Sequence, residues 1–407
     1  MSGSLGQEQA TVEEREARVF LHTYKRLPID IERGDGPYLY GKDGKQYLDM
    51  FGGIAVNALG YRHPAVTKAI HAQVDRFLHV SNMFFQDTQL ALAERLTAAS
   101  GFPRVFFTNS GTEAMEGALK LVRKWGVKGR RKNIFGLSDS FHGRTLGSLS
   151  ITGRDKYRDG YAPFLPGTSI LRFNDADALR SAVNEDTLAV VLEFIQGEGG
   201  INVVSGEYVR TLQELRDTFG FLVVADEIQS GVGRTGRFFA FEHFPFRPDI
   251  VVCAKAIGGG LPLGALLVSA PLDEVFTPGV HGTTFGGNPV SCAAGHAALG
   301  EILEGGLMKN AERVGSYLEQ SLRSVQNEFP DVVAEVRGMG LMLGLEMRQD
   351  ATGLVDGLRD AGVLVLQTNT TVLRWLPPLI INDTHVDTAI RSLRETITAV
   401  YRTHVHA

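Results

Sequence analysis

The chain has 407 residues, 43% of them apolar, and a formal net charge of −5. This length suggests one large and one smaller domain, and the negative charge offers no broad basic surface, so we do not expect nucleic acid as a partner. The polar first residues and the lack of any apolar run of roughly 18 residues predict a cytoplasmic protein with no membrane span.

Cys253 and Cys292 are too few for a disulfide framework or a four-ligand zinc site, and we expect no bound metal. Near the start of the chain, residues 38–40 and 46–48 flank an Asp43-Gly44 turn and predict a β-hairpin. We expect residues 1–60 to pack with the C-terminal part of the chain.

The middle of the chain, residues 61–300, alternates apolar runs with amphipathic stretches, which indicates βα units on a mostly parallel sheet. The runs are apolar on both faces, as buried parallel strands are. Strands are predicted at residues 104–108, 133–137, 187–194, 221–225, 250–254 and 264–269.

The last part, residues 301–407, begins with a long helix. Apolar residues recur there at steps of three and four from Leu307 to Phe329, and Pro330 ends the pattern. Strands at 341–346, 363–367 and 372–376 and helices at 354–361 and 385–404 follow. The predicted fold class is therefore α/β, with a large domain built on a mostly parallel sheet and a smaller α+β domain.

Lys255 and Asp226 each follow an apolar run, 29 residues apart, and Lys255 opens into a glycine-rich turn. A lone lysine beside glycines is more often a loop residue with its amine in water. If the two runs are neighbouring strands, however, both side chains emerge at the edge of the sheet where α/β proteins bind ligands. Pyridoxal phosphate needs both groups: a desolvated amine to react with its aldehyde, and an acid to pair with its ring nitrogen.

Ser110, Gly111 and Thr112 connect a predicted strand to a predicted helix, so free backbone N–H groups and hydroxyls could bind a phosphate there. Without Lys255, an ordinary capped helix would be the better interpretation. Residues 141–145 could supply an aromatic cover for a flat ring and a guanidinium for a carboxylate, and Gln229 could donate to a ring oxygen.

Two glycine motifs favour other ligands only superficially. Residues 231–236 spell G-x-G-x-x-G, but four residues separate them from the preceding strand, and no acidic-ended second strand follows at the expected distance. Residues 36–42 resemble a phosphate loop until Asp43, which stands where a magnesium-binding hydroxyl is required. A dinucleotide site or a nucleotide phosphate loop is therefore not expected.

These segments together resemble the class III aminotransferases, which have the PLP-dependent transferase fold type I, from about Tyr24 to the C-terminus. Within that family, several segments are similar to the acetylornithine aminotransferase subgroup. The segments that carry the resemblance are residues 110–114, 141–145, 226–229, 231–236, 255–260 and 282–289, and those that favour the subgroup are 27–28, 53–60, 79–82 and 193–200.

The resemblance implies a role for each matching residue. Lys255 would form the covalent imine with pyridoxal 5′-phosphate and later transfer protons, and Asp226 would pair with the ring nitrogen. The other cofactor-binding residues would be Ser110, Gly111, Thr112, Phe141, His142, Gln229 and Thr284, with Thr284 contributed across a homodimer interface to the partner's cofactor. Substrate would be bound by Arg144, Glu198, Thr283 and Arg374.

The implied reaction moves the ω-amino group of N-acetylornithine, or of a similar N-acylated diamino acid, to 2-oxoglutarate in arginine biosynthesis. Glu198 would neutralise Arg374 while the ω-amine reacts, and Arg144 would hold the α-carboxylate of the donor. Ornithine, 4-aminobutyrate and succinyl-diaminopimelate transaminases are alternatives, as is a PLP-dependent aminomutase. Phe194, Met115 and Gly117 depart from the pattern of the family.

Overall fold

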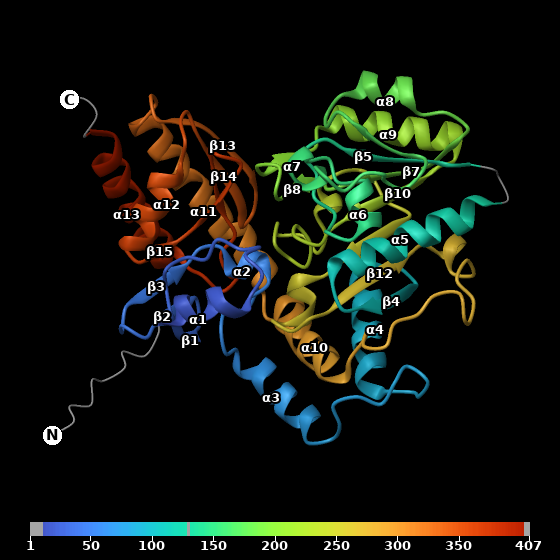
Figure 1. Cartoon of the computed structure of the whole chain (residues 1–407), viewed down its shortest axis with the longest axis horizontal. Coiled ribbons are helices and arrows are strands. Elements are labelled where there is room, and N and C mark those ends of the chain that lie inside the picture. Colours follow the sequence, from blue (N-terminus) through green and yellow to red (C-terminus); the bar gives the residue numbers. More distant parts are fainter. Residues whose placement is uncertain (1–10, 128–130, 403–407) are drawn as a thin grey trace.

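The computed structural model describes residues 11–127 and 131–402, which form a broad α/β body and a second group of strands and helices beside it (Figure 1). The predicted polar start at residues 1–10 and residues 403–404 of the last predicted helix lie outside these ranges. The domain boundaries at 60 and 300 stay predictions.

A seven-stranded sheet forms the centre of the larger body, in the order β4-β12-β11-β10-β7-β5-β6. All its strands run parallel except β12, which is antiparallel to both neighbours. The prediction of a mostly parallel sheet is thus confirmed. Its strands are β4 (Arg104–Thr108), β5 (Asn133–Leu137), β6 (Thr168–Leu171), β7 (Thr187–Leu192), β10 (Leu222–Asp226), β11 (Ile250–Cys253) and β12 (Gly264–Val268).

Helices cover this sheet because its central strands are apolar on both faces; every residue of β7, β10, β11 and β12 is buried. Helix α5 packs against β7, β10, β11 and β12, and α10 packs against α3 and α4. The helices of residues 52–304 are α2 (Gly52–Ala55), α3 (Pro64–Val74), α4 (Asp87–Ser100), α5 (Gly111–Gly126), α6 (Leu146–Ser150), α7 (Asp155–Arg158), α8 (Ala176–Ala182), α9 (Gly206–Phe219) and α10 (Pro289–Glu304), with 3₁₀ turns η2 (Ala240–His243), η3 (Lys255–Gly258) and η4 (Ala270–Leu272).

The second group contains an antiparallel sheet in the order β13-β14-β17-β16 and a sheet in the order β1-β2-β3-β15. In the latter, β3 from near the start of the chain pairs in parallel with β15 from near its end. The elements are α1 (Val12–Val19), β1 (Ile31–Asp35), β2 (Tyr38–Gly41), β3 (Gln46–Asp49), α11 (Leu307–Glu328), β13 (Val333–Met339), β14 (Met342–Met347), α12 (Thr352–Asp360), β15 (Val363–Leu364), β16 (Leu366–Thr368), β17 (Val372–Trp375) and α13 (Asp383–Arg402). A short hairpin, β8 (Ile195–Gln196) with β9 (Asn202–Val203), follows β7 in the chain and contacts β13 through β9.

Candidate functional site

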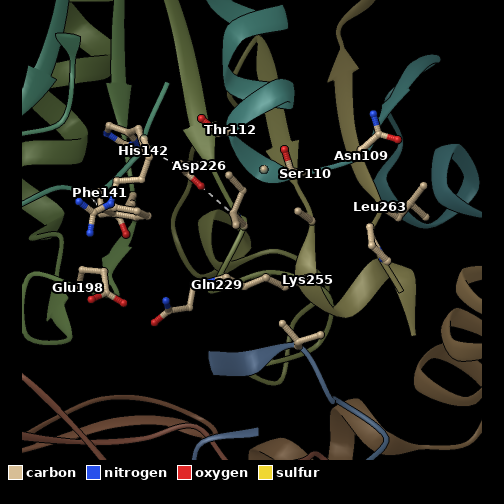
Figure 2. Close-up of a pocket in the computed structure, with 18 of the residues that line it drawn as sticks. Asn109, Ser110, Thr112, Phe141, His142, Glu198, Asp226, Gln229, Lys255 and Leu263 are labelled. Carbon is tan, nitrogen blue, oxygen red and sulfur yellow. Dashed lines mark hydrogen bonds and ion pairs between the residues drawn. The ribbon is translucent and has the colours of Figure 1, made fainter. Parts of the chain in front are cut away.

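A cavity of about 470 Å³ opens at the carboxyl ends of the central strands. Ten of the thirteen predicted site residues line it: Ser110, Gly111, Thr112, Phe141, His142, Arg144, Glu198, Asp226, Gln229 and Lys255. Figure 2 shows Phe141, His142 and Glu198 along one wall, Asn109, Ser110 and Leu263 along the other, and Asp226, Gln229 and Lys255 between them.

Asp226 and Lys255 reach the cavity from neighbouring strands. Strands β10 and β11 are parallel partners, with Asp226 opposite Val252, which confirms the predicted adjacency. Asp226 ends its strand, and Lys255 follows β11 by two residues, with a left-handed φ of 49°. This backbone conformation is uncommon for a residue with a side chain, and unusual torsions of this kind cluster at functional sites.

Asp226 is buried and paired with His142. Oδ2 of Asp226 accepts from Nδ1 of His142 at 2.7 Å, and Oδ1 accepts from the backbone N–H of Ile228 at 3.0 Å. Burial lowers the pKa of His142, but the hydrogen bond to Asp226 and the charges of Asp226 and Glu193 outweigh it, so the pKa is raised. The carboxylate of Asp226 therefore stands against a buried imidazole that is a stronger base than an ordinary histidine.

Lys255 is a weaker base than an ordinary lysine. Burial lowers the pKa of its amine to about 8, and the nearby charge of Arg374 acts in the same direction, while Glu198, Asp226 and Glu193 oppose it. A much larger fraction of this amine is therefore neutral near pH 7 than for a lysine in water, which makes it a usable nucleophile.

The first turn of α5 borders the cavity and leaves little room for side chains. Ser110 caps the helix, since its hydroxyl accepts from the N–H of Glu113 at 3.3 Å. A Cβ on Gly111 would lie 2.6 Å from Cδ1 of Ile228, so this position favours glycine. The capping interpretation is confirmed, and Ser110, Gly111 and Thr112 also line the cavity at the N-terminus of the helix, where an anion would be stabilised.

Arg374 contributes to the site from the second group of strands, although it does not line the cavity. It sits on β17 with 2% of its surface exposed and forms an ion pair with Glu198. Its guanidinium also donates to the carbonyl of Gly197 at 3.2 Å and to Oε1 of Gln229 at 3.3 Å. Burial raises the pKa of Glu198, but the charge and hydrogen bond of Arg374 outweigh it and lower the pKa.

Arg144 lies at the exposed side of the cavity, with its guanidinium 3.9 Å from the ring centre of Tyr157 and 5.6 Å from that of Phe141. The rings of Phe141 and Tyr157 meet edge to face at 5.5 Å. Arg144 is thus held against aromatic rings, while its N–H groups stay open to a ligand.

Thr283 and Thr284 do not line the cavity of this chain. Thr284 is exposed, and Oγ1 of Thr283 accepts from Nδ2 of Asn109 at 3.3 Å. Asn82 ties the same loop down by donating to the carbonyls of Thr283 at 3.2 Å and Gly286 at 3.0 Å. The loop therefore presents Thr284 at the surface.

Sequence reasoning missed Glu193, which also lines the cavity and is buried. One of its carboxylate oxygens accepts from the N–H of Phe141 and the other from that of Gly197, both at 3.0 Å. Burial raises the pKa of Glu193 to about 7. The signal was present, since an acid directly after the buried strand β7 stands at the same sheet edge as Asp226. Asn109, after β4, was missed in the same way.

The G-x-G-x-x-G segment at residues 231–236 forms turns and does not lead into an α-helix. Arg234 within it is buried and donates to the carbonyls of Leu341, at 3.1 Å, and Pro377. The segment therefore joins the two parts of the molecule. Over residues 11–127 and 131–402, no cluster of three or more His, Cys, Asp or Glu residues could hold a metal ion, and no helix is long and apolar enough to cross a membrane.

A sequence model of the family described as Aminotransferase class-III matches residues 19–397. Acetylornithine aminotransferase of Aquifex aeolicus is 43% identical over 380 residues, which cover 92% of this chain and 98% of that protein. The same enzyme of Methanocaldococcus jannaschii is 41% identical, with 95% and 97% covered. Ornithine aminotransferase of Toxoplasma gondii has a similar structure, with a TM-score of 0.93, 30% identity and 97% of each chain covered. The acetylornithine aminotransferase of Elizabethkingia anophelis has a TM-score of 0.86 at 31% identity, covering 95% and 98%.

Proposed function

Because the chain belongs to the class III aminotransferase family, we propose that it moves the ω-amino group of N-acetylornithine, or of a similar N-acylated diamino acid, to 2-oxoglutarate. The products are a semialdehyde and glutamate, and the reaction belongs to arginine biosynthesis. The relatives named above, at 41–43% identity over nearly their whole length, support this donor. The observation that carries the proposal is the Glu198–Arg374 ion pair beside Lys255.

Pyridoxal phosphate fits the residues of the cavity. The cramped first turn of α5 suits the phosphate, because its N–H groups are close to the cavity and Gly111 has no side chain. Asp226, which is hydrogen-bonded to His142, suits the protonated ring nitrogen, Gln229 suits the ring oxygen and Phe141 suits the ring face. The cofactor, when bound, would delocalise the electron pair that stays on the substrate carbon when a base removes its proton.

Lys255 is the residue to which the cofactor attaches. It then acts as the acid and base that transfers the substrate's proton. Its Nζ, with a pKa of about 8, would accept a proton from the substrate carbon and donate it to the former aldehyde carbon of the bound cofactor. Such a transfer requires an amine that can exist in both protonation states near neutral pH. The buried position of Lys255 supplies that property.

Two arginines bind the carboxylates of the two substrates, and each binds a different one. The exposed Arg144 holds the α-carboxylate of the donor, whose reacting amine lies at the other end of the molecule. Arg374 would bind an α-carboxylate in the wrong orientation, so Glu198 neutralises it during the first half-reaction. When 2-oxoglutarate enters, Glu198 leaves and Arg374 takes the carboxylate of the keto acid. We also propose Thr283 as a substrate-binding residue, although its loop does not line the cavity of its own chain.

We further propose a homodimer in which Thr284 reaches the cofactor phosphate of the partner. An exposed apolar surface, here called the apolar rim, supports it: Leu78, Met83, Phe84, Phe85 and Phe285. Phe285 of the rim follows Thr284, the rings of His79 and Phe285 are 5.2 Å apart, and Asn82 bonds the same loop. Exposed apolar patches often mark interfaces. Phe84→Glu should yield monomers in sedimentation velocity, whereas Thr284→Ala should stay dimeric and bind the cofactor more weakly.

A donor competition assay tests the reaction. N-acetylornithine, ornithine, 4-aminobutyrate and succinyl-diaminopimelate are offered together with 2-oxoglutarate, and the glutamate and semialdehyde formed are counted. N-acetylornithine should have the highest kcat/KM, and Lys255→Ala should form no product and lack the visible absorbance of the wild-type protein. A higher kcat/KM for ornithine would replace the donor but keep the reaction class, and turnover without any keto acid would indicate a mutase.

A further inference from the structure

The four consecutive carbonyl groups of residues 197–200, here called the glutamate loop, all accept hydrogen bonds from side chains. The first accepts from Arg374 at 3.2 Å, the third from Nδ2 of Asn369 at 3.0 Å, and the fourth from Nε of Arg337 at 2.8 Å. These three donors come from the second group of strands and their connecting turn. The main chain around Glu198 is therefore fixed to the same part of the molecule that carries Arg374.

The second carbonyl of the loop, that of Glu198 itself, accepts from two side chains, Arg154 and Thr368. Arg154 also donates to Oδ1 of Asn369 at 2.6 Å. Asn369 follows β16 with a left-handed φ of 53°, which allows its amide to bond both Arg154 and the loop. Arg154 follows Gly153 in the larger body. It thus connects that body to the hairpin of β16 and β17, which carries Arg374.

Arg154 is a buried cation without a carboxylate of its own. Only 8% of its surface is exposed, and the ion pairs of residues 11–127 and 131–402 do not include it. Its charge nevertheless acts on Glu198 and lowers the pKa of that carboxyl, after the stronger effects of burial, Arg374 and Lys255. A carboxylate that leaves Arg374 inside the protein needs another nearby positive charge to stay ionised.

We propose that Arg154 is a positioning residue that sets the preference for ω-amine donors. It holds the main chain of Glu198 against the hairpin of Arg374, and it keeps a positive charge beside Glu198 when the ion pair opens. The inference rests on the proposed function, because it assigns a role to Arg154 only if Glu198 governs the choice of donor.

Three variants separate the charge from the hydrogen bonds. Arg154→Met removes both, Arg154→Lys keeps the charge, and Thr368→Val removes one donor to the Glu198 carbonyl without changing any charge. The matched control is Arg131→Met, because Arg131 also donates to backbone carbonyls, but these belong to Thr187, Phe219 and Gly220 and not to the glutamate loop. Each variant is assayed for kcat/KM with N-acetylornithine and with glutamate as donor, and for thermal unfolding.

For Arg154→Met we expect the ratio of the two kcat/KM values to fall about tenfold, the size of one charge-assisted hydrogen bond. Arg154→Lys should recover part of the ratio, Thr368→Val should lower it less, and Arg131→Met should change only the unfolding temperature. A crystal structure of the Arg154→Met apoenzyme should show the Glu198 carbonyl displaced. If Glu198→Ala changes the ratio but the Arg154 variants only lose stability, this inference is wrong and the proposed function stands. If Glu198→Ala leaves the ratio unchanged, the proposed switch at Glu198 fails, and this inference fails with it.

Discussion

The reactivity of Lys255 can be measured without any cofactor. With a pKa of about 8, about 9% of its amine is neutral at pH 7, against about 0.03% for the ordinary value of 10.5, a ratio of about 300. A less basic amine is also a weaker nucleophile. If that loss follows the slope of about 0.4–0.5 known for thiolates, it removes a factor of about 10–18. We therefore expect Lys255 to react roughly 20-fold faster than an ordinary lysine at pH 7.

Competitive labelling of the apoenzyme with trace acetic anhydride, followed by peptide mass spectrometry, gives this rate at each pH. The exposed Lys309 serves as the internal reference. Labelling of Lys255 should be half-maximal near pH 8. Arg374→Met should shift the midpoint upward, because a repelling cation is removed, and Glu198→Gln should shift it downward, because an attracting anion is removed.

The result that would refute this reasoning is a midpoint above pH 10 in the wild-type apoenzyme. In that case the cavity would solvate the ammonium as well as water does. Unchanged midpoints in both variants would show that the charges of Arg374 and Glu198 do not reach Nζ of Lys255.

Three other predictions concern residues in the site or next to it in the sequence. Asp226→Asn should lower the pKa of His142, because the hydrogen bond and charge that raise it are lost, and an NMR titration of the ring that finds no change would contradict the pair. Burial raises the pKa of Glu227 to about 7, so its ionisation lowers the free energy of unfolding as the pH rises from about 4.5 to 7. In urea unfolding of the apoenzyme, Glu227→Gln should make this decrease with pH smaller. An equal dependence on pH in both proteins would argue against it. Gly111→Ala should weaken binding of the cofactor at least tenfold in equilibrium titration, because its Cβ would lie 2.6 Å from Ile228, and unchanged affinity would mean that Ile228 moves freely.

Sequence patterns predicted those parts of the fold whose structure is determined by one local pattern of residues. Strands β4 and β5 have the predicted bounds, because each is a short apolar run between turns. Strand β13 was missed, since Glu335 and Arg337 interrupt its apolar residues and form ion pairs on the sheet instead. The antiparallel direction of β12 was also not predicted, because a buried strand looks the same in either direction.

The candidate site divides in the same way. Asp226 and Lys255 could be placed together from physics alone, because both end parallel strands at one edge. The pairing of Glu198 with Arg374 depended on family resemblance, since the two lie 176 residues apart and meet through a separate sheet. Phe194, a departure from the family pattern, is explained by packing: its ring lies 5.5 Å from that of Phe244 and 5.9 Å from that of Phe246.

The pairing of β3 with β15 has a consequence for how the chain is made. Leu48 can pair only after Val363, more than 300 residues later, has been translated. The strands of the seven-stranded sheet, in contrast, all lie between residues 104 and 268. During synthesis that sheet can close, with its reactive amine in place, before the arginine of β17 has been translated. Until β15 has been translated, the edge of β3 that pairs with it is open and can pair with a wrong strand.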